Sequence, residues 1–348
     1  MRKIVWLVFI AVLAGAAWFV WAVLTPVEPP VETFVMLRPG YSTRRIAAEL
    51  KANGIIRSEQ AFILWQYLHR GRSLKAGEYR FEKSRNLIDV HDRLARGDVY
   101  FHTVVVPEGF TMFDIARAVE AAGLGPADDF LKVAQSDTAL IADLAPGAPS
   151  LEGYLFPDTY EFSRMQSMQD MTAAMVKQFR KVAGEIGLVQ PYPSEKPGGK
   201  PQVSAYLIPD PNEVAAKVTM ASIIEKETAV AEERPLVASV YYNRLAKNIA
   251  LDADPSIIYA ELLAGTYTGA LHHDDMHFNS PYNTYTHAGL PPGPIANPGK
   301  SALEAAIHPA QSDYYYFVAD AQGHHRFART IEEHDKNVAA YRRALRGK

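Results

Sequence analysis

The chain has 348 residues, of which 48% are hydrophobic and 22% are charged, a balance typical of globular proteins with sizeable cores. The formal net charge of -3 offers no basic field to a phosphate backbone, so nucleic acid is not expected as a partner. The absence of cysteine excludes disulfides, thiolate metal sites, cysteine nucleophiles and lipid attachment to cysteine.

An uncharged apolar segment covers residues 4–24 and directly follows the basic pair at 2–3. At about 1.5 Å per residue, such a helix matches a hydrocarbon core of roughly 30 Å. A cleaved secretory signal, with a small-x-small site at Ala14 and Ala16, is the alternative, but the apolar run continues past that site. We expect a retained single-pass anchor over residues 1–25. The basic pair would stay in the cytoplasm and the rest of the chain would lie in the periplasm, on the outer side of a bacterial inner membrane.

A repeat without gaps follows this segment. The string VMLRPGYSTRRIAAELKANGI, residues 35–55, aligns with VVVPEGFTMFDIARAVEAAGL, residues 104–124. Each copy predicts a short strand, a glycine turn and a helix that ends at a second glycine. Two copies indicate a duplicated small binding unit rather than a solenoid.

The rest of the chain becomes mainly helical, with one predicted β-hairpin near the C-terminus, so we expect an α+β fold. The expected segments are a Pro-rich spacer at 26–33, a first α/β subdomain at 34–103, the second copy with a helical subdomain at 104–188, a Pro/Gly-rich loop at 189–211, and a mainly helical domain at 212–348.

The string ASIIEKET places Glu225 and Glu227 on a helix predicted over about 212–230. Residues two apart on a helix point about 200° apart, so these carboxylates cannot form one catalytic pair. Small neighbours of Glu225 would leave room for a cleft, where desolvation would raise its pKa and keep a proton for donation. The alternative is that both are charges on a partly exposed helix, paired with Lys226 or with Arg244 on the next helix.

Five strings occur in order along the chain: LEGYLFPDTY, ASIIEKET, VASVYYNRL, DADPSIIY and SPYNTYTHAGLPPGPIANPG. Together with the anchor and the duplication, they resemble the endolytic murein transglycosylases of the YceG-like family. The resemblance extends from about Val35 to the C-terminus. It implies that the duplicated segment is LysM-like, that the helical domain is the lytic transglycosylase domain, and that Glu225 is the catalytic residue. Glu227 then becomes a supporting residue, through a salt bridge or a hydrogen bond.

The implied reaction needs only one carboxyl group, because a lytic transglycosylase consumes no water. A carboxylic acid protonates the leaving oxygen, and the resulting carboxylate takes a proton from the 6-hydroxyl of N-acetylmuramic acid. The resemblance thus implies a lyase that cleaves the MurNAc-GlcNAc β-1,4 bond of nascent peptidoglycan strands, leaves 1,6-anhydro ends and terminates strand elongation. It uses no cofactor, and peptidoglycan synthases are expected partners. A membrane-anchored peptidoglycan-binding scaffold without catalysis is the alternative.

The remaining candidates are supporting or substrate-binding residues: Glu152, Ser222, Glu227, Tyr282, Asn283, Thr284 and Tyr285. Tyr282 and Tyr285 would stack on sugar faces, while Asn283 and Thr284 would bind acetamido groups or orient the acid. For Glu152, lining the cleft and capping a helix remain equally open.

One further cluster suggests metal ligands. The string LHHDDMHF, residues 271–278, contains His272, His273, Asp274, Asp275 and His277. Their spacing matches no motif of fixed metal geometry, so we expect no metal site.

Overall fold

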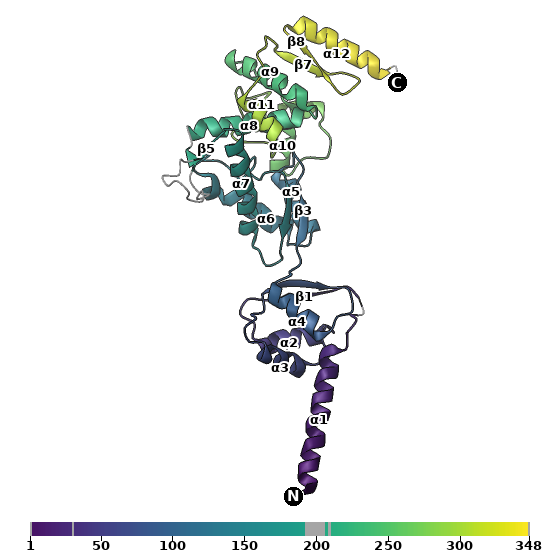
Figure 1. Cartoon of the computed structure of the whole chain (residues 1–348). Coiled ribbons are helices and arrows are strands. Elements are labelled where there is room, and N and C mark those ends of the chain that lie inside the picture. The colour runs from purple at the N-terminus through teal and green to yellow at the C-terminus, as the bar shows by residue number, and fades with distance from the viewer. Residues whose placement is uncertain (1, 30, 192–205, 208–209, 347–348) are drawn as a thin grey trace. The chain divides into compact units, whose positions relative to one another are not determined.

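The computed structural model describes residues 2–29, 31–191, 206–207 and 210–346 (Figure 1). The chain forms two compact units. Unit 1 contains Met1–Thr103 and Glu161–Ser167, and unit 2 contains Val104–Tyr160 and Met168–Lys348. Of the loop expected at 189–211, residues 192–205 and 208–209 lie outside the described residues. The short strands β5 (Gln190–Pro191) and β6 (Tyr206–Leu207) pair antiparallel.

Helix α1 (Arg2–Leu24) has 23 residues and is long and apolar enough to span a membrane. Most of its side chains are exposed, whereas Ala22 and Val23 are buried in the hydrophobic core of unit 1. This pattern fits a membrane anchor whose C-terminal end is packed against a folded unit.

Unit 1 then continues through β1 (Thr33–Leu37), α2 (Thr43–Ala52), α3 (Glu59–Leu68), β2 (Gly77–Phe81) and α4 (Leu87–Arg96). Strands β1 and β2 pair antiparallel, with Val35 opposite Tyr79. Ser42, Ser58 and Asn86 each accept a hydrogen bond from a backbone N–H in the first turn of the helix that they precede, which starts α2, α3 and α4.

The second copy of the repeat has the same order of strand, helix, helix and strand: β3 (His102–Val105), α5 (Met112–Ala121), α6 (Ala127–Ser136) and β4 (Thr159–Phe162), with the 3-10 turn η1 (Thr138–Ile141) before β4. The turn glycines Gly40 and Gly109 have φ of 83° and 78°. The glycines after α2 and α5, Gly54 and Gly123, have φ of 69° and 71°. All four adopt a left-handed conformation that side chains with a Cβ disfavour, which explains why the glycines of the two copies align.

The remainder of unit 2 is mainly helical: α7 (Met168–Glu185), α8 (Pro211–Glu227), η2 (Ala231–Glu233), α9 (Arg234–Ala246), α10 (Asp254–Ala264), η3 (His273–His277), α11 (Lys300–Ile307) and α12 (Ile331–Arg346). Helices α9 and α11 both pack on α8. The hairpin expected near the C-terminus is present as β7 (Tyr316–Ala319) and β8 (His325–Ala328). This mixture of helices and two-stranded sheets agrees with the expected α+β class.

Helix α8 begins at a cap and ends earlier than the pattern predicts. Asp210 accepts a hydrogen bond from the Asn212 N–H, and Pro211 occupies the first helical position. The helix ends at Glu227, because Thr228 is extended, with φ of -139° and ψ of 131°. Glu227 is therefore the last residue of the helix, whereas the predicted span of 212–230 would place it in the interior of the helix.

Candidate functional site

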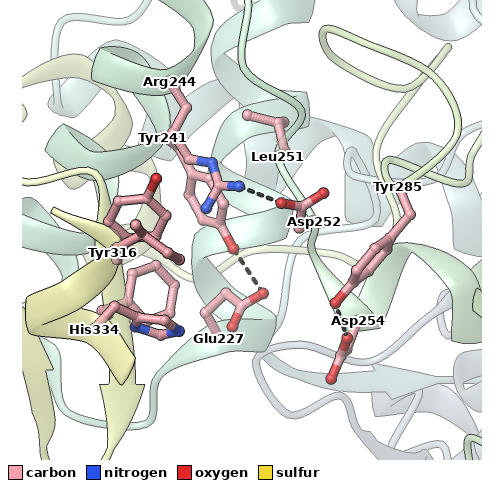
Figure 2. A pocket seen from close by; sticks show the side chains of 11 residues that line it. Glu227, Tyr241, Arg244, Leu251, Asp252, Asp254, Tyr285, Tyr316 and His334 are labelled. Atoms are coloured by element: carbon pink, nitrogen blue, oxygen red, sulfur yellow. Dashed lines mark hydrogen bonds and ion pairs between the residues drawn. The ribbon is translucent and has the colours of Figure 1, made fainter. Parts of the chain in front are cut away.

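A pocket of about 400 Å³ lies in unit 2, where the end of α8 meets α9, the start of α10, the β7–β8 hairpin and α12 (Figure 2). Its lining residues are Glu227, Tyr241, Arg244, Leu251, Asp252, Asp254, Tyr285, Tyr316, Phe317, Ile331 and His334.

The carboxyl group of Glu227 faces this pocket from the end of α8. One of its oxygens accepts a hydrogen bond of 2.7 Å from the Tyr241 hydroxyl, as Figure 2 shows. Burial raises the pKa of Glu227 to about 7, the hydrogen bond from Tyr241 opposes the shift, and the Asp254 carboxylate adds to it. A carboxyl group with this pKa is roughly half protonated near neutral pH, so it can both donate and accept a proton.

The segment before α10 forms one wall of the pocket, and an ion pair and hydrogen bonds fix its side chains. Asp252 forms an ion pair with Arg244, and the Arg244 Nε donates to the Ala250 carbonyl at 2.7 Å. The Tyr285 hydroxyl donates to Asp254 at 2.5 Å. These contacts keep the carboxylates of Asp252 and Asp254 engaged with fixed donors.

Aromatic side chains from the hairpin and from α12 form the opposite wall. The rings of Tyr316 and His334 stack with their centroids 5.3 Å apart. The Arg244 guanidinium lies 5.6 Å from the Tyr316 ring. Burial lowers the pKa of His334, which keeps the imidazole neutral near pH 7.

Glu225 has different surroundings, although it lies only two residues before Glu227. Its side chain is 5% exposed, and one oxygen is 2.7 Å from the Arg234 Nη2. The other oxygen accepts a hydrogen bond of 2.9 Å from the Gly299 N–H. Burial raises the pKa of Glu225, while the Gly299 N–H and the Arg234 guanidinium oppose this shift. A proton on Glu225 would break this short ion pair and leave the buried guanidinium with only the longer contact of 3.7 Å to the Glu108 carboxylate.

The two glutamates therefore occupy separate sites, as their helical spacing predicts. Glu225 forms an ion pair, one of the alternatives open from the sequence, but with Arg234 at the start of α9 rather than with Lys226 or Arg244. The cleft expected beside Glu225 does not match this pocket, which Glu227 lines and Glu225 does not.

Glu152 is 1% exposed and does not line the pocket. It accepts hydrogen bonds from the Met112 N–H at 2.9 Å and from the Asn297 side chain at 2.7 Å. Burial raises its pKa to about 8, against the opposing effect of the Met112 N–H. Of the two interpretations left open, the contacts favour capping, and the capped helix is α5 of the second repeat copy.

The other candidates from the sequence are mostly buried within the loop at 279–300 or beneath it. Ser222 is 0% exposed and accepts a hydrogen bond of 3.0 Å from the Ile295 N–H. Asn283 is also 0% exposed, and its side chain donates to two carbonyls of the preceding turn. Both side chains thus bond backbone groups in or next to this loop.

Thr284 and Tyr282 are buried as well. The Thr284 hydroxyl accepts a hydrogen bond of 3.0 Å from the Ala253 N–H. The Tyr282 ring packs 5.2 Å from that of Tyr259. Tyr285, by contrast, is 37% exposed and lines the pocket, whereas the other three loop candidates do not line it.

The histidine and aspartate cluster forms the 3-10 turn η3. Within it, the Asp275 carboxylate accepts a hydrogen bond of 2.6 Å from the His272 N–H. Among the residues that the structure describes, no group of three His, Asp or Glu side chains is arranged to hold a metal ion.

Several pocket residues are not predicted as site residues from the sequence. Tyr241 and Arg244 belong to the string VASVYYNRL, and Asp252 and Asp254 to DADPSIIY, so the strings contain a signal for them. Tyr316 and His334 come from the hairpin and from α12, far along the chain. Only the tertiary fold brings the C-terminal elements to the end of α8.

The chain is similar to a known protein family, to two named relatives and to one solved structure. The model of the YceG-like family matches residues 35–340. A Bacillus subtilis protein named endolytic murein transglycosylase is 34% identical over 349 residues, which cover 95% of this chain and 91% of that protein. A Streptococcus pneumoniae protein of the same name is 30% identical over 370 residues, covering 96% of this chain and 64% of the relative. A crystal structure of a yceG-like protein from Listeria monocytogenes, 31% identical, covers 88% of this chain and 98% of that chain with a TM-score of 0.54.

Proposed function

The chain belongs to the YceG-like family, and from this premise we propose that it is an endolytic murein transglycosylase, a lyase that acts on peptidoglycan, with Glu227 as its acid and base. One observation supports the assignment of Glu227 as the acid and base. Glu227 presents to a pocket of about 400 Å³ a carboxyl group whose pKa is raised to about 7. A volume of this size lies within the range of roughly 300–1,000 Å³ that is common for ligand sites.

The chemistry needs a group that first gives a proton and then takes one. Glu227 donates its proton to the glycosidic oxygen as the bond between this oxygen and C1 of N-acetylmuramic acid breaks. The carboxylate then removes the proton of the 6-hydroxyl, whose oxygen forms the new bond to C1 and closes the 1,6-anhydro ring. The proton returns to Glu227 and no water is consumed. The Tyr241 hydroxyl holds one carboxyl oxygen at 2.7 Å and leaves the other for the substrate.

The assignment replaces Glu225, the residue expected from the family resemblance. A carboxyl group that cycles between acid and base must lose and regain its proton at low cost. The Glu225 carboxylate lies beside Arg234, whose side chain is 6% exposed. Each protonation of Glu225 would break this buried ion pair. We propose that Glu225 is a positioning residue, which joins α8 to the start of α9 and to Gly299.

The aromatic walls suit a sugar strand. Tyr285 and Tyr316 present rings at the pocket, and apolar sugar faces stack on such rings. The neutral imidazole of His334 offers a hydrogen-bonding group on the same wall.

The proposed location follows from α1. We propose that α1 anchors the chain in the bacterial inner membrane as a single span, with unit 2 in the periplasm. The two strand-helix-helix-strand copies are proposed to be LysM-like, with the first copy as a glycan-binding subdomain. Attachment to the membrane would restrict cleavage to nascent strands near the bilayer and would place the enzyme beside peptidoglycan synthases.

The test is digestion of purified peptidoglycan by the full chain in detergent, followed by mass spectrometry of the released muropeptides. We expect 1,6-anhydro ends without incorporation of ¹⁸O from labelled water, and an unchanged rate in the presence of a chelator. Strand binding without any new ends would support the non-catalytic scaffold instead. Reducing ends that carry ¹⁸O would indicate a hydrolase and contradict the proposal.

A further inference from the structure

Helix α3 is apolar on two sides. Ala61 and Phe62 are fully buried in the core of unit 1, whereas Leu64, Tyr67 and Leu68 are 45%, 59% and 61% exposed. The exposed three are spaced i, i+3 and i+4, so they form one continuous surface, called here the α3 stripe. An exposed apolar stripe on a helix whose other side is buried in a core is typical of a surface that contacts a partner protein or a membrane.

The position of α3 relative to α1 decides between these environments. The two helices are in contact, and Ala22 and Val23 of α1 share a hydrophobic core with Phe62 of α3. In Figure 1, α3 lies at the end of unit 1 from which α1 projects, and β1 lies at the other end. The α3 stripe is thus near the C-terminal end of the membrane-spanning helix.

The length of α1 sets the level of the membrane surface. A hydrocarbon core of about 30 Å requires about 20 residues of helix, so the whole apolar run of residues 4–24 is needed to span it. Ala22 and Val23 then lie at the outer edge of the hydrocarbon. Because unit 1 packs on these residues, α3 is held at the boundary between the hydrocarbon and the headgroups.

Arginine and aromatic side chains accompany the stripe. The Arg70 guanidinium lies 3.5 Å from the centre of the Tyr67 ring, and the Arg57 guanidinium lies 5.1 Å from that of Trp21. Neither arginine forms an ion pair with an acidic side chain among the residues that the structure describes. Aromatic rings with adjacent guanidinium groups are typical of membrane interfaces, where the ring lies at the level of the headgroups and the charge meets phosphate.

We propose that the α3 stripe, with Arg57 and Arg70, is a lipid-binding surface that lies on the outer leaflet of the membrane that holds α1. Leu64, Tyr67 and Leu68 enter the interfacial region, and the two guanidinium groups bind lipid phosphates. The proposal rests on the proposed anchoring by α1 and is independent of the catalytic assignment. Its consequence is that unit 1 is fixed to the membrane by two contacts, one spanning and one lying on the surface.

Depth-dependent quenching of a fluorophore tests this proposal. Because the chain has no cysteine, a single Leu68→Cys substitution can carry an environment-sensitive dye on the full chain in nanodiscs that hold one protein each. The control is the same dye at Phe34→Cys, on β1, where the native side chain is 37% exposed. Lipids with a quencher near the headgroup should quench the dye at 68 at least twofold more than the dye at 34. Equal quenching at the two positions would overturn the proposal.

Two further measurements identify what the α3 stripe contacts. Phosphatidylglycerol should increase the quenching at 68 relative to phosphatidylcholine, and Arg57→Gln with Arg70→Gln should remove this increase. No dependence on the headgroup would overturn the phosphate contacts. If the lipid quencher does not quench the dye at 68 in nanodiscs that hold one copy, and the dye is shielded from water only when two copies share a disc, the proposal is overturned. The α3 stripe is then an interface between two copies of the chain. Digestion of peptidoglycan by the same samples reports on the catalytic proposal separately.

Discussion

The last turn of α8 holds two carboxyl groups in contrasting environments. Glu225 faces Arg234 and the Gly299 N–H, and its ionised form is balanced by a buried positive charge. Glu227 has one neutral donor, Tyr241, and opens onto the pocket. Helical spacing makes the two side chains point in different directions. The partners that other segments supply decide which of the two carboxyl groups can exchange its proton near neutral pH.

The largest expected effect is the loss of activity in Glu227→Gln. An amide cannot donate the proton to the leaving oxygen, so the rate of formation of anhydro ends should fall by about 10²–10⁴-fold. The measurement is the initial rate on purified strands, with the melting temperature as a check on folding. Glu225→Gln is the matched control and should stay within about tenfold of the native rate per folded molecule. If Glu227→Gln is active while Glu225→Gln is inactive and folded, the roles of the two glutamates are reversed.

Glu225→Gln should instead have the larger effect on stability. It leaves the buried Arg234 guanidinium with only the longer contact of 3.7 Å to Glu108, which should lower the free energy of unfolding by about 3 kcal/mol. Denaturant unfolding of the full chain in detergent measures this change. Combining it with Arg234→Met should recover part of the loss, because the buried charge that has lost its short partner is then removed too, and Glu108 is half exposed to solvent. Equal stability of the native chain and Glu225→Gln would contradict a structural ion pair.

The pH dependence of stability should distinguish Glu227 from ordinary surface carboxylates. Its folded-state pKa of about 7 lies above that of an unfolded glutamate, so the folded state holds the proton more tightly between about pH 4.5 and 7. This contribution to stability is present at low pH and is lost as the pH rises through 7. Glu227→Gln should therefore be more stable than the native chain at pH 8, by about 1–3 kcal/mol, and show a smaller difference at pH 5. A constant difference at both pH values would show that Glu227 does not titrate in this range.

The smallest expected effect is that of Tyr241→Phe. Removing the hydroxyl takes away the hydrogen bond that favours the carboxylate, so the pKa of Glu227 should rise further. The alkaline limb of the pH–rate profile should then move upward, by up to about one unit. Tyr242→Phe, on the neighbouring residue, removes a hydroxyl that bonds the Ala306 carbonyl and does not line the pocket. A limb that moves equally in both variants, or downward in Tyr241→Phe, would argue against Glu227 as the titrating group.

The sequence is sufficient where a feature depends on local chemistry. The apolar run at residues 4–24 predicts α1, and the aligned glycines predict the repeated turns, because these features need only chain length and a left-handed φ. The spacing of Glu225 and Glu227 likewise shows that they cannot form one catalytic pair. The strings that resemble the YceG-like family predict the family, which the comparisons confirm.

The tertiary structure decides which residue meets which partner. Nothing local to ASIIEKET indicates that Glu225 meets Arg234 and Gly299, or that Tyr316 and His334 approach the end of α8. Asn283 and Thr284 look like sugar-binding residues in the sequence, yet both are buried and bond backbone groups of the preceding turn and of the residue before α10. The physical reason is that a pKa and an open surface depend on burial and on charges brought together from distant segments, and these are properties of the packed chain.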